Sequence, residues 1–195
     1  MRTSFILFSF IFLSQTLIFA QITKTTEGPF SQLIIRGATL INGNGAPPIG
    51  PVDITVKEDK ITAIDVVGYP GVAIQENKRP KLKKGGKEID ATGMFILPGF
   101  IDMHGHIGGV SQGADWDYVF KLWLAHGITT VREPSGRGIE YAVDLKKRSL
   151  KNEIIAPRVI AYTGFGQGSK SPISTEEQAR EWVRQNAKNG ADGVK

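Results

Sequence analysis

Short runs in which apolar and polar residues alternate characterise the chain between residues 33 and 67. The clearest runs are 52–56 and 61–67, which are separated by the turn residues 58–60. Alternation with a period of two is typical of β-strands that bury one face. Two such strands joined by a tight turn form a hairpin. The pattern therefore predicts a small antiparallel sheet, and we assign the β-rich part of the chain to residues 21–97.

The spacing of apolar residues changes after residue 95. Repeats of three or four residues, typical of amphipathic helices, now alternate with short apolar runs. One helix is expected to begin at the capping pair Ser174 and Glu177 and to end at the stop signal Asn189-Gly190. The other expected elements are strands at 95–103, 128–131, 158–162 and 191–195 and helices at 115–125 and 139–150. This alternation indicates parallel strands joined by crossover helices.

The number of expected elements limits the α/β fold. A (β/α)8 barrel usually needs about 250 residues, so the expected strands and helices would form about half of one. A flavodoxin-like open sheet is the alternative, and it would also be incomplete. We interpret residues 98–195 as the truncated first half of a barrel, and we expect the chain to be an N-terminal fragment.

The first twenty residues differ from the rest of the chain. Met1-Arg2 is a short basic start, and residues 5–20 are almost entirely apolar. This run is short for a membrane span, which needs about 20 apolar residues, but it is typical of a secretory signal peptide. We expect residues 1–20 to be removed on export, giving a secreted or periplasmic protein with no stable membrane association. An uncleaved anchor is the alternative.

Composition excludes several classes of protein. Hydrophobic residues make up 41% and charged residues 22% of the 195 residues, which is typical of a globular chain rather than a disordered or collagen-like one. The chain has no cysteine, so disulfides, thiolate zinc sites and cysteine nucleophiles are excluded. The net charge is +5, but the basic stretch 78–84 has no accompanying aromatic platform. We therefore expect no nucleic-acid partner.

The candidate chemistry centres on the motif Pro98-Gly-Phe-Ile-Asp-Met-His-Gly-His106. On a strand, His104 and His106 would lie on the same side with Cβ atoms about 7 Å apart. Two neutral imidazoles placed in this way can both reach one metal ion. Gly105 between them would let the backbone come close to the site. The alternative is a pair of histidines on a surface turn.

This motif resembles the Pro-Gly-(apolar)-Ile-Asp-x-His-x-His signature that ends the first barrel strand in the amidohydrolase superfamily. The segment 127–132 is similar to the family's second strand, although Glu133 stands where the family usually has aspartate. The hairpins before residues 89–93 resemble the family's small N-terminal β-sandwich. The resemblance implies an α/β fold in which a β-sandwich part, residues 21–97, precedes the first half of a (β/α)8 TIM-like barrel, residues 98–195.

Residues 190–195 resemble the fourth strand of imidazolonepropionase-like and prolidase-like members, in which the lysine at this place is carbamylated and bridges two metals. The resemblance therefore implies that His104, His106 and Lys195 bind one or two divalent ions, with Zn²⁺ expected. Desolvation in a barrel mouth would favour the neutral amine, which can take up CO2. The general base and the remaining ligands are expected beyond residue 195. Judged without the family, Lys195 is an ordinary charged residue at a strand end.

The function that the resemblance implies is metal-dependent hydrolysis of an amide, cyclic amide or similar C–N bond of a small-molecule substrate by a metal-bound hydroxide. One alternative is a non-catalytic extracellular binding or scaffold protein of the same fold. A second is a mononuclear deaminase-like enzyme, which would not need Lys195. The substrate is not determined by these residues, and an oligomer is compatible with them.

Other polar residues have secondary roles in this interpretation. Asp102 is expected to orient the site by hydrogen bonds rather than to bind metal. His126 suits the last carbonyl groups of a helix. Arg132 and Glu133 end the expected second strand and are candidates to line the pocket, with a buried structural ion pair as the equal alternative. The glycine-rich loop 164–169 lacks nucleotide-loop spacing and would instead contact substrate.

Overall fold

The computed structural model describes residues 27–109, 113–134 and 136–195. The expected signal peptide, residues 1–20, lies outside the described residues. Within those residues, no helix has the length and apolar character needed to cross a membrane. The chain divides into two compact units, one formed by 27–38 with Gly50–Met94 and the other by Thr39–Ile49 with Phe95–Lys195.

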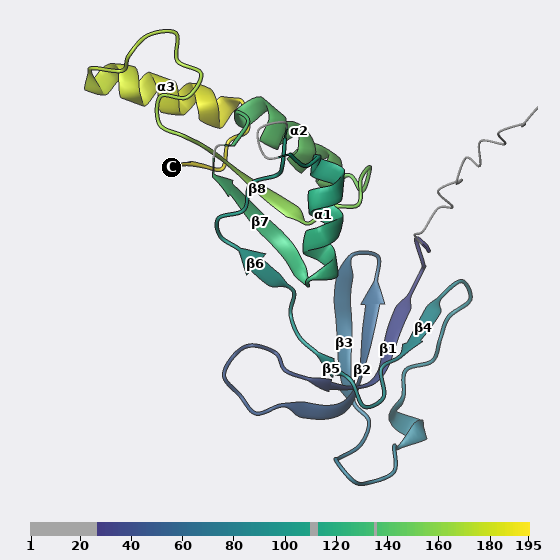
Figure 1. Cartoon of the computed structure of the whole chain (residues 1–195). Helices are drawn as coiled ribbons and strands as arrows, with labels where there is room; N and C mark the ends of the chain where they lie inside the picture. Colours follow the sequence, from purple (N-terminus) through teal and green to yellow (C-terminus); the bar gives the residue numbers. More distant parts are fainter. Residues whose placement is uncertain (1–26, 110–112, 135) are drawn as a thin grey trace, which may run out of the picture. The chain divides into compact units, whose positions relative to one another are not determined.

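The first unit is built on a β-sheet with the strand order β3-β2-β1-β4 (Figure 1). These strands are β1 (Leu33–Leu40), β2 (Ile49–Lys57), β3 (Lys60–Val66) and β4 (Lys87–Asp90). The β2–β3 pair is the predicted antiparallel hairpin. The expectation of an entirely antiparallel sheet is wrong, because β4 pairs with β1 in the parallel sense. A long connection between β3 and β4, which includes a short 3-10 helix at Glu76–Lys78, brings the chain back in the direction of β1.

A buried carboxylate fixes the centre of this sheet. Asp53 on β2 is completely buried, and it accepts hydrogen bonds from Arg36 Nη1 at 2.8 Å, Arg79 Nε at 3.0 Å and the Gly37 amide at 2.9 Å. Burial alone would raise the pKa of Asp53, but the hydrogen bonds from Arg79, Gly37 and Arg36 outweigh it and lower the pKa below its ordinary value. The period-two pattern in β2 predicted one buried face, whereas residues 52–55 are all buried. The charged network accounts for the burial of Asp53 on the second face.

The second unit contains the predicted parallel α/β arrangement. Its four-stranded sheet has the order β6-β7-β8-β9 with every neighbouring pair parallel. The strands are β6 (Phe100–Asp102), β7 (Ile128–Pro134), β8 (Arg158–Thr163) and β9 (Gly193–Val194), and the helices between them are α1 (Trp116–Ala125), α2 (Ile139–Leu150) and α3 (Glu176–Lys188). The α/β fold class is confirmed. Within the described residues the four strands form an open sheet rather than a closed barrel (Figure 1).

Two local predictions in this unit need correction. The single strand expected at 95–103 is divided into β5 (Phe95–Ile96), which pairs with β1, and β6. Pro98 lies between them, and it has no amide N–H to donate to a sheet ladder. The capping box of α3 is formed by Thr175 and Gln178, one residue after the expected pair.

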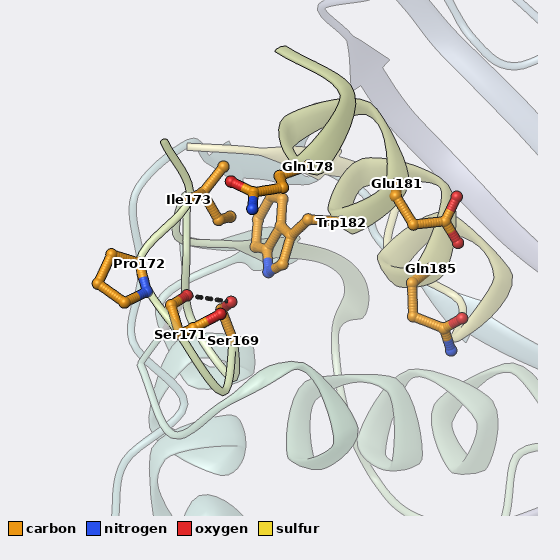
Figure 2. A pocket seen from close by; sticks show the side chains of 8 residues that line it. All are labelled: Ser169, Ser171, Pro172, Ile173, Gln178, Glu181, Trp182 and Gln185. Atoms are coloured by element: carbon orange, nitrogen blue, oxygen red, sulfur yellow. Dashed lines mark hydrogen bonds between the residues drawn. The ribbon is translucent and has the colours of Figure 1, made fainter. Parts of the chain in front are cut away.

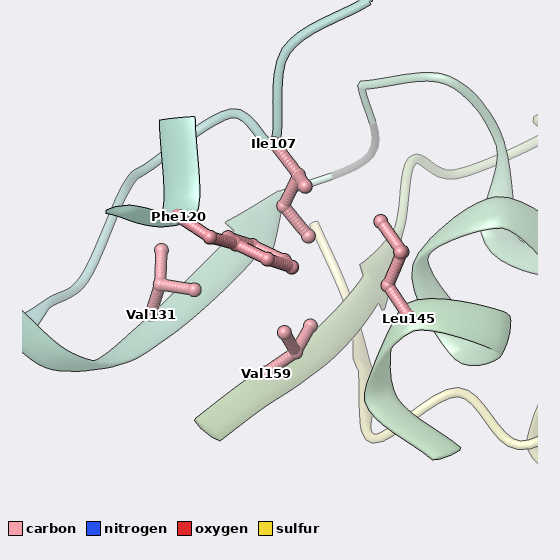
Figure 3. Packing of buried hydrophobic residues seen from close by; sticks show 5 residues of the cluster. All are labelled: Ile107, Phe120, Val131, Leu145 and Val159. Atoms are coloured by element: carbon pink, nitrogen blue, oxygen red, sulfur yellow. The ribbon is translucent and has the colours of Figure 1, made fainter. Parts of the chain in front are cut away.

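The main core of this unit lies between the sheet and its first two helices (Figure 3). Trp116 and Trp123 of α1 pack against this core. Its buried members come from both helices, from β7 and β8, and from the segment after β6: Ile107, Phe120, Val131, Leu145 and Val159. Because Ile107 directly follows His106, its burial anchors the segment that contains both candidate ligands.

Candidate metal site

The two histidines of the motif lie together just beyond the end of β6. Their ring centroids are 5.4 Å apart and the rings meet nearly edge-on, at 83°. The sequence placed them on the strand itself, but β6 ends at Asp102. They belong instead to an irregular segment, residues 103–107, which we call the histidine segment. The expected proximity is therefore present, although strand alternation is not its cause.

A buried carboxylate from the next strand holds His106. Glu133 of β7 is 2% exposed, and its Oε1 lies 3.0 Å from His106 Nδ1. The same carboxylate accepts the amide of Ile107 at 2.6 Å and the amide of Gly136 at 2.7 Å. Glu133 thus contacts a candidate ligand rather than Arg132. Its family position was recognised in the sequence, but its partner was not.

Further hydrogen bonds fix the rest of the histidine segment. Asp102 Oδ1 accepts the His104 amide at 2.9 Å, so Asp102 orients the backbone as expected. Arg132 Nε donates to the Met103 carbonyl at 2.5 Å, and the Arg132 carbonyl accepts the Gly105 amide at 3.1 Å. The ends of β6 and β7 therefore determine the path of the backbone on both sides of His104.

Two glycines permit these close approaches. A Cβ at Gly105 would lie 2.6 Å from Val131 Cγ2 and 2.8 Å from Trp123 Cζ2, and a Cβ at Gly136 would lie 3.0 Å from Glu133 Oε1. Gly105 was expected to bring the backbone near the site, and the structure shows that it also brings the backbone against the core. Gly136 could not be recognised from the sequence, because its role depends on a contact with a carboxylate from β7.

His126 has the structural role expected for it. It is the C-cap residue of α1, and its Nδ1 lies 2.8 Å from the Leu122 carbonyl oxygen. The ring therefore satisfies one of the carbonyl groups at the helix end. His126 provides a natural comparison for the two histidines of the histidine segment.

Lys195 follows β9, three strands away from β6 in the sheet. Its amide donates to the Thr163 carbonyl at 2.8 Å, so the residue continues the ladder with β8. A Cβ at Gly193 would lie 2.6 Å from the Tyr162 ring, so Gly193 faces the same side of the sheet as Tyr162. Because side chains alternate along a strand, Lys195 is directed to that side as well. The three strand spacings between β6 and β9 amount to about 14 Å across a flat sheet.

Asp192 and Lys146 support the placement of β9. Asp192 Oδ2 accepts the Ala161 amide at 2.8 Å, and its Oδ1 contacts Lys146 Nζ at 2.5 Å. Lys146 also reaches the Gly190 carbonyl at 3.3 Å. These residues were missed in the sequence, because a contact between α2 and the turn before β9 leaves no local pattern.

The two imidazoles are suitable metal donors, but they are fewer than the three protein ligands that a catalytic zinc usually has. In the parts of the chain that the structure describes, no three histidine, cysteine, aspartate or glutamate side chains lie where they could hold a metal together. His104 and His106 provide two imidazole donors, whereas a catalytic zinc usually has three protein ligands. The carboxylate behind His106 is the kind of partner that metal-binding histidines usually have.

A separate pocket of about 320 Å³ lies between the loop after β8 and α3. Figure 2 shows Trp182 beside Ile173 at this pocket, with Glu181 and Gln185 projecting from α3. Ser169 from the loop also lines it. Among the described residues that line this pocket, none is a candidate metal ligand. The predicted substrate contact of loop 164–169 remains a prediction.

The chain is similar in sequence and in fold to several known enzymes. No family model matches the chain. The chain is 33% identical over 101 residues to a D-hydantoinase of Rhizobium radiobacter, in a match that covers 50% of this chain and 18% of the relative. It is 38% identical over 102 residues to an N-acyl-D-aspartate deacylase of Alcaligenes xylosoxydans xylosoxydans, covering 52% of this chain and 17% of the relative.

The fold agrees with these sequence matches. A solved amidohydrolase structure superposes with a TM-score of 0.60 and 18% sequence identity, covering 84% of this chain and 46% of that chain. Together, the sequence matches and the shared fold point to the amidohydrolase superfamily. Members of this superfamily bind divalent metals. The chain spans less than half the length of each of these three relatives.

Proposed function

We propose that the whole protein containing this chain is a metal-dependent hydrolase that acts on an amide or cyclic amide C–N bond of a small molecule. The observation that supports this most strongly is the pairing of His104 with His106 at the end of β6, with a buried carboxylate behind His106. In barrels of this kind the C-terminal ends of the strands form the active site. The names of the two relatives, a hydantoinase and a deacylase, agree with C–N bond hydrolysis.

A divalent ion held at this site would polarise the substrate carbonyl group and lower the pKa of a water molecule. The residues of this chain position the ligands. Asp102 and Arg132 fix the backbone around His104, and Glu133 holds the ring of His106. We propose Zn²⁺ as the ion, and we place the general base beyond residue 195.

We further propose that Lys195 is carbamylated and bridges two ions. Its position on the face of the sheet shared with Tyr162 supports this role, since that face is opposite the one on which Ala161 packs against α2. An uncharged or carbamylated form is needed there, because an ammonium group would repel the ions. A mononuclear enzyme would not need Lys195, so the effect of replacing it distinguishes the two alternatives.

The proposed location is outside the cytoplasm. The basic start and the apolar run in residues 1–20 support export with cleavage after Ala20. Secretion or a periplasmic location would then follow for the mature protein.

Activity of the purified, zinc-loaded whole protein tests the proposed reaction. We expect release of a carboxylate and an amine from N-acyl amino acids, or ring opening of cyclic amides. His104→Ala should abolish this activity. His126→Ala is the matched control, because the chain has three histidines and this one caps α1. Equal activity of the wild type and His104→Ala would refute the proposal, as would a complete lack of hydrolysis by zinc-loaded wild type across both substrate classes.

A further inference from the structure

The contact between Glu133 and His106 determines which nitrogen of the imidazole is available to a metal. Glu133 is almost fully buried, and its two oxygens together meet three nitrogen atoms. Two of these are the backbone amides of Ile107 and Gly136, which can only donate. With a backbone N–H directed at each of its two oxygens, the carboxylate is arranged as an acceptor, which favours the histidine as the owner of the proton between Glu133 Oε1 and His106 Nδ1.

This assignment fixes the tautomer of His106. A neutral imidazole has one N–H donor and one acceptor nitrogen. If Nδ1 has the proton and donates it to Glu133, then Nε2 keeps its lone pair and is the nitrogen that can bind a cation. The ring of His106 lies edge-on to that of His104, with centroids 5.4 Å apart, so both rings belong to one cluster.

The carboxylate is itself held in place. The Ile107 amide that it accepts belongs to a residue whose side chain is anchored in the core (Figure 3). Gly136 approaches so closely that a Cβ there would lie 3.0 Å from Glu133 Oε1 and 3.2 Å from His106 Nδ1. The short approach at Gly136 and the anchor at Ile107 leave the carboxylate little freedom to turn away from His106.

We propose that Glu133 is a positioning residue for His106, which keeps the proton on Nδ1 and presents Nε2 to the metal. The proposal rests on the proposed function, because it assumes that His106 is a ligand. It also gives a role to the glutamate that stands where the superfamily usually has aspartate.

The tautomer can be observed directly in the wild-type protein. Histidine labelled with ¹⁵N and a long-range proton–nitrogen correlation spectrum distinguish the two neutral tautomers, and His106→Ala assigns the signals. We expect the Nδ1–H form of His106 in the metal-free whole protein. The Nε2–H form in the wild type would overturn the proposal without any need for a Glu133 variant.

Replacement of the carboxylate supplies the second readout. Glu133→Ala should lose the tautomer preference and bind Zn²⁺ about 10–100-fold more weakly in competition with a chelator. Glu133→Gln should fall between Glu133→Ala and the wild type, because its amide oxygen can still accept from His106 Nδ1. Glu140→Ala, which removes an exposed carboxylate in the first turn of α2, is the matched control and should bind zinc like the wild type. Unchanged zinc affinity in Glu133→Ala would overturn the positioning role.

The two proposals can fail separately. A wild-type protein that binds no zinc refutes the proposed function, whichever tautomer its spectrum shows. A wild type that binds zinc through His104 and His106 but shows no tautomer preference refutes the role of Glu133 alone.

Discussion

Gly105 offers a steric test of how the histidine segment is held. In Gly105→Ala the new methyl group would lie 2.6 Å from Val131 Cγ2 and 2.8 Å from Trp123 Cζ2. Favourable carbon contacts need about 3.5–4.0 Å, so the atoms must separate by about 1 Å. Val131 is completely buried in the core, and Gly105 is tied to the Arg132 carbonyl. Neither side can move freely, and overpacking of this kind costs about 1–3 kcal/mol.

The displacement should also reach the two candidate ligands that flank Gly105, which are His104 and His106. A misplacement of about 1 Å can cost about 100-fold in function, so we expect zinc affinity to fall by about 10–100-fold together with the loss of stability. Chelator competition measures the first effect and urea unfolding the second. Gly71→Ala is the control, because it meets no atom within 4 Å but has a φ of +77°. It should cost about 1–2 kcal/mol and leave zinc affinity unchanged. Wild-type affinity and stability in Gly105→Ala would refute the reasoning.

Three further predictions follow from other parts of the chain. Folding lowers the pKa of Asp53 below its ordinary 3.8, so its contribution to stability is complete above that pH and is lost as the pH falls through the lower folded-state pKa. The difference in urea midpoint between wild type and Asp53→Asn should therefore shrink on acidification, and a constant difference from pH 6 to pH 2 would contradict this. Lys195→Ala should lose one of two metals and most activity, with partial recovery in short carboxylic acids but none in Lys195→Arg. Two bound metals and full activity in Lys195→Ala would refute the bridging role of Lys195. Intact mass of exported protein should show removal of residues 1–20, and a mature chain beginning at Met1 would refute cleavage.

The elements with strong local patterns could be predicted from the sequence. The helix expected at 139–150 has those bounds in the structure, because its helical pattern and its basic last turn are local features of the sequence. The parallel order of β6 to β9 also follows from the alternation of strands and helices. The pairing of β4 with β1 could not be predicted, since it depends on how a long connection returns to the sheet.

In the candidate site, too, the local features could be predicted from the sequence and the contacts between distant residues could not. The paired histidines were evident from their spacing, but the sequence placed them on a strand that ends two residues before His104. The partner of Glu133 could not be found, because the contact joins positions 27 residues apart. Gly136 had no sequence signal either, since it matters only after Glu133 and His106 have been brought together.

The most direct test of the central claim is the metal content of the whole protein and its histidine variants, measured by plasma emission after purification without added chelator. A metal site at the histidine pair predicts bound zinc in the wild type and in His126→Ala, and a loss of metal in both His104→Ala and His106→Ala while the proteins remain folded. Full metal occupancy in His104→Ala and His106→Ala would contradict it and would make the histidine pair structural.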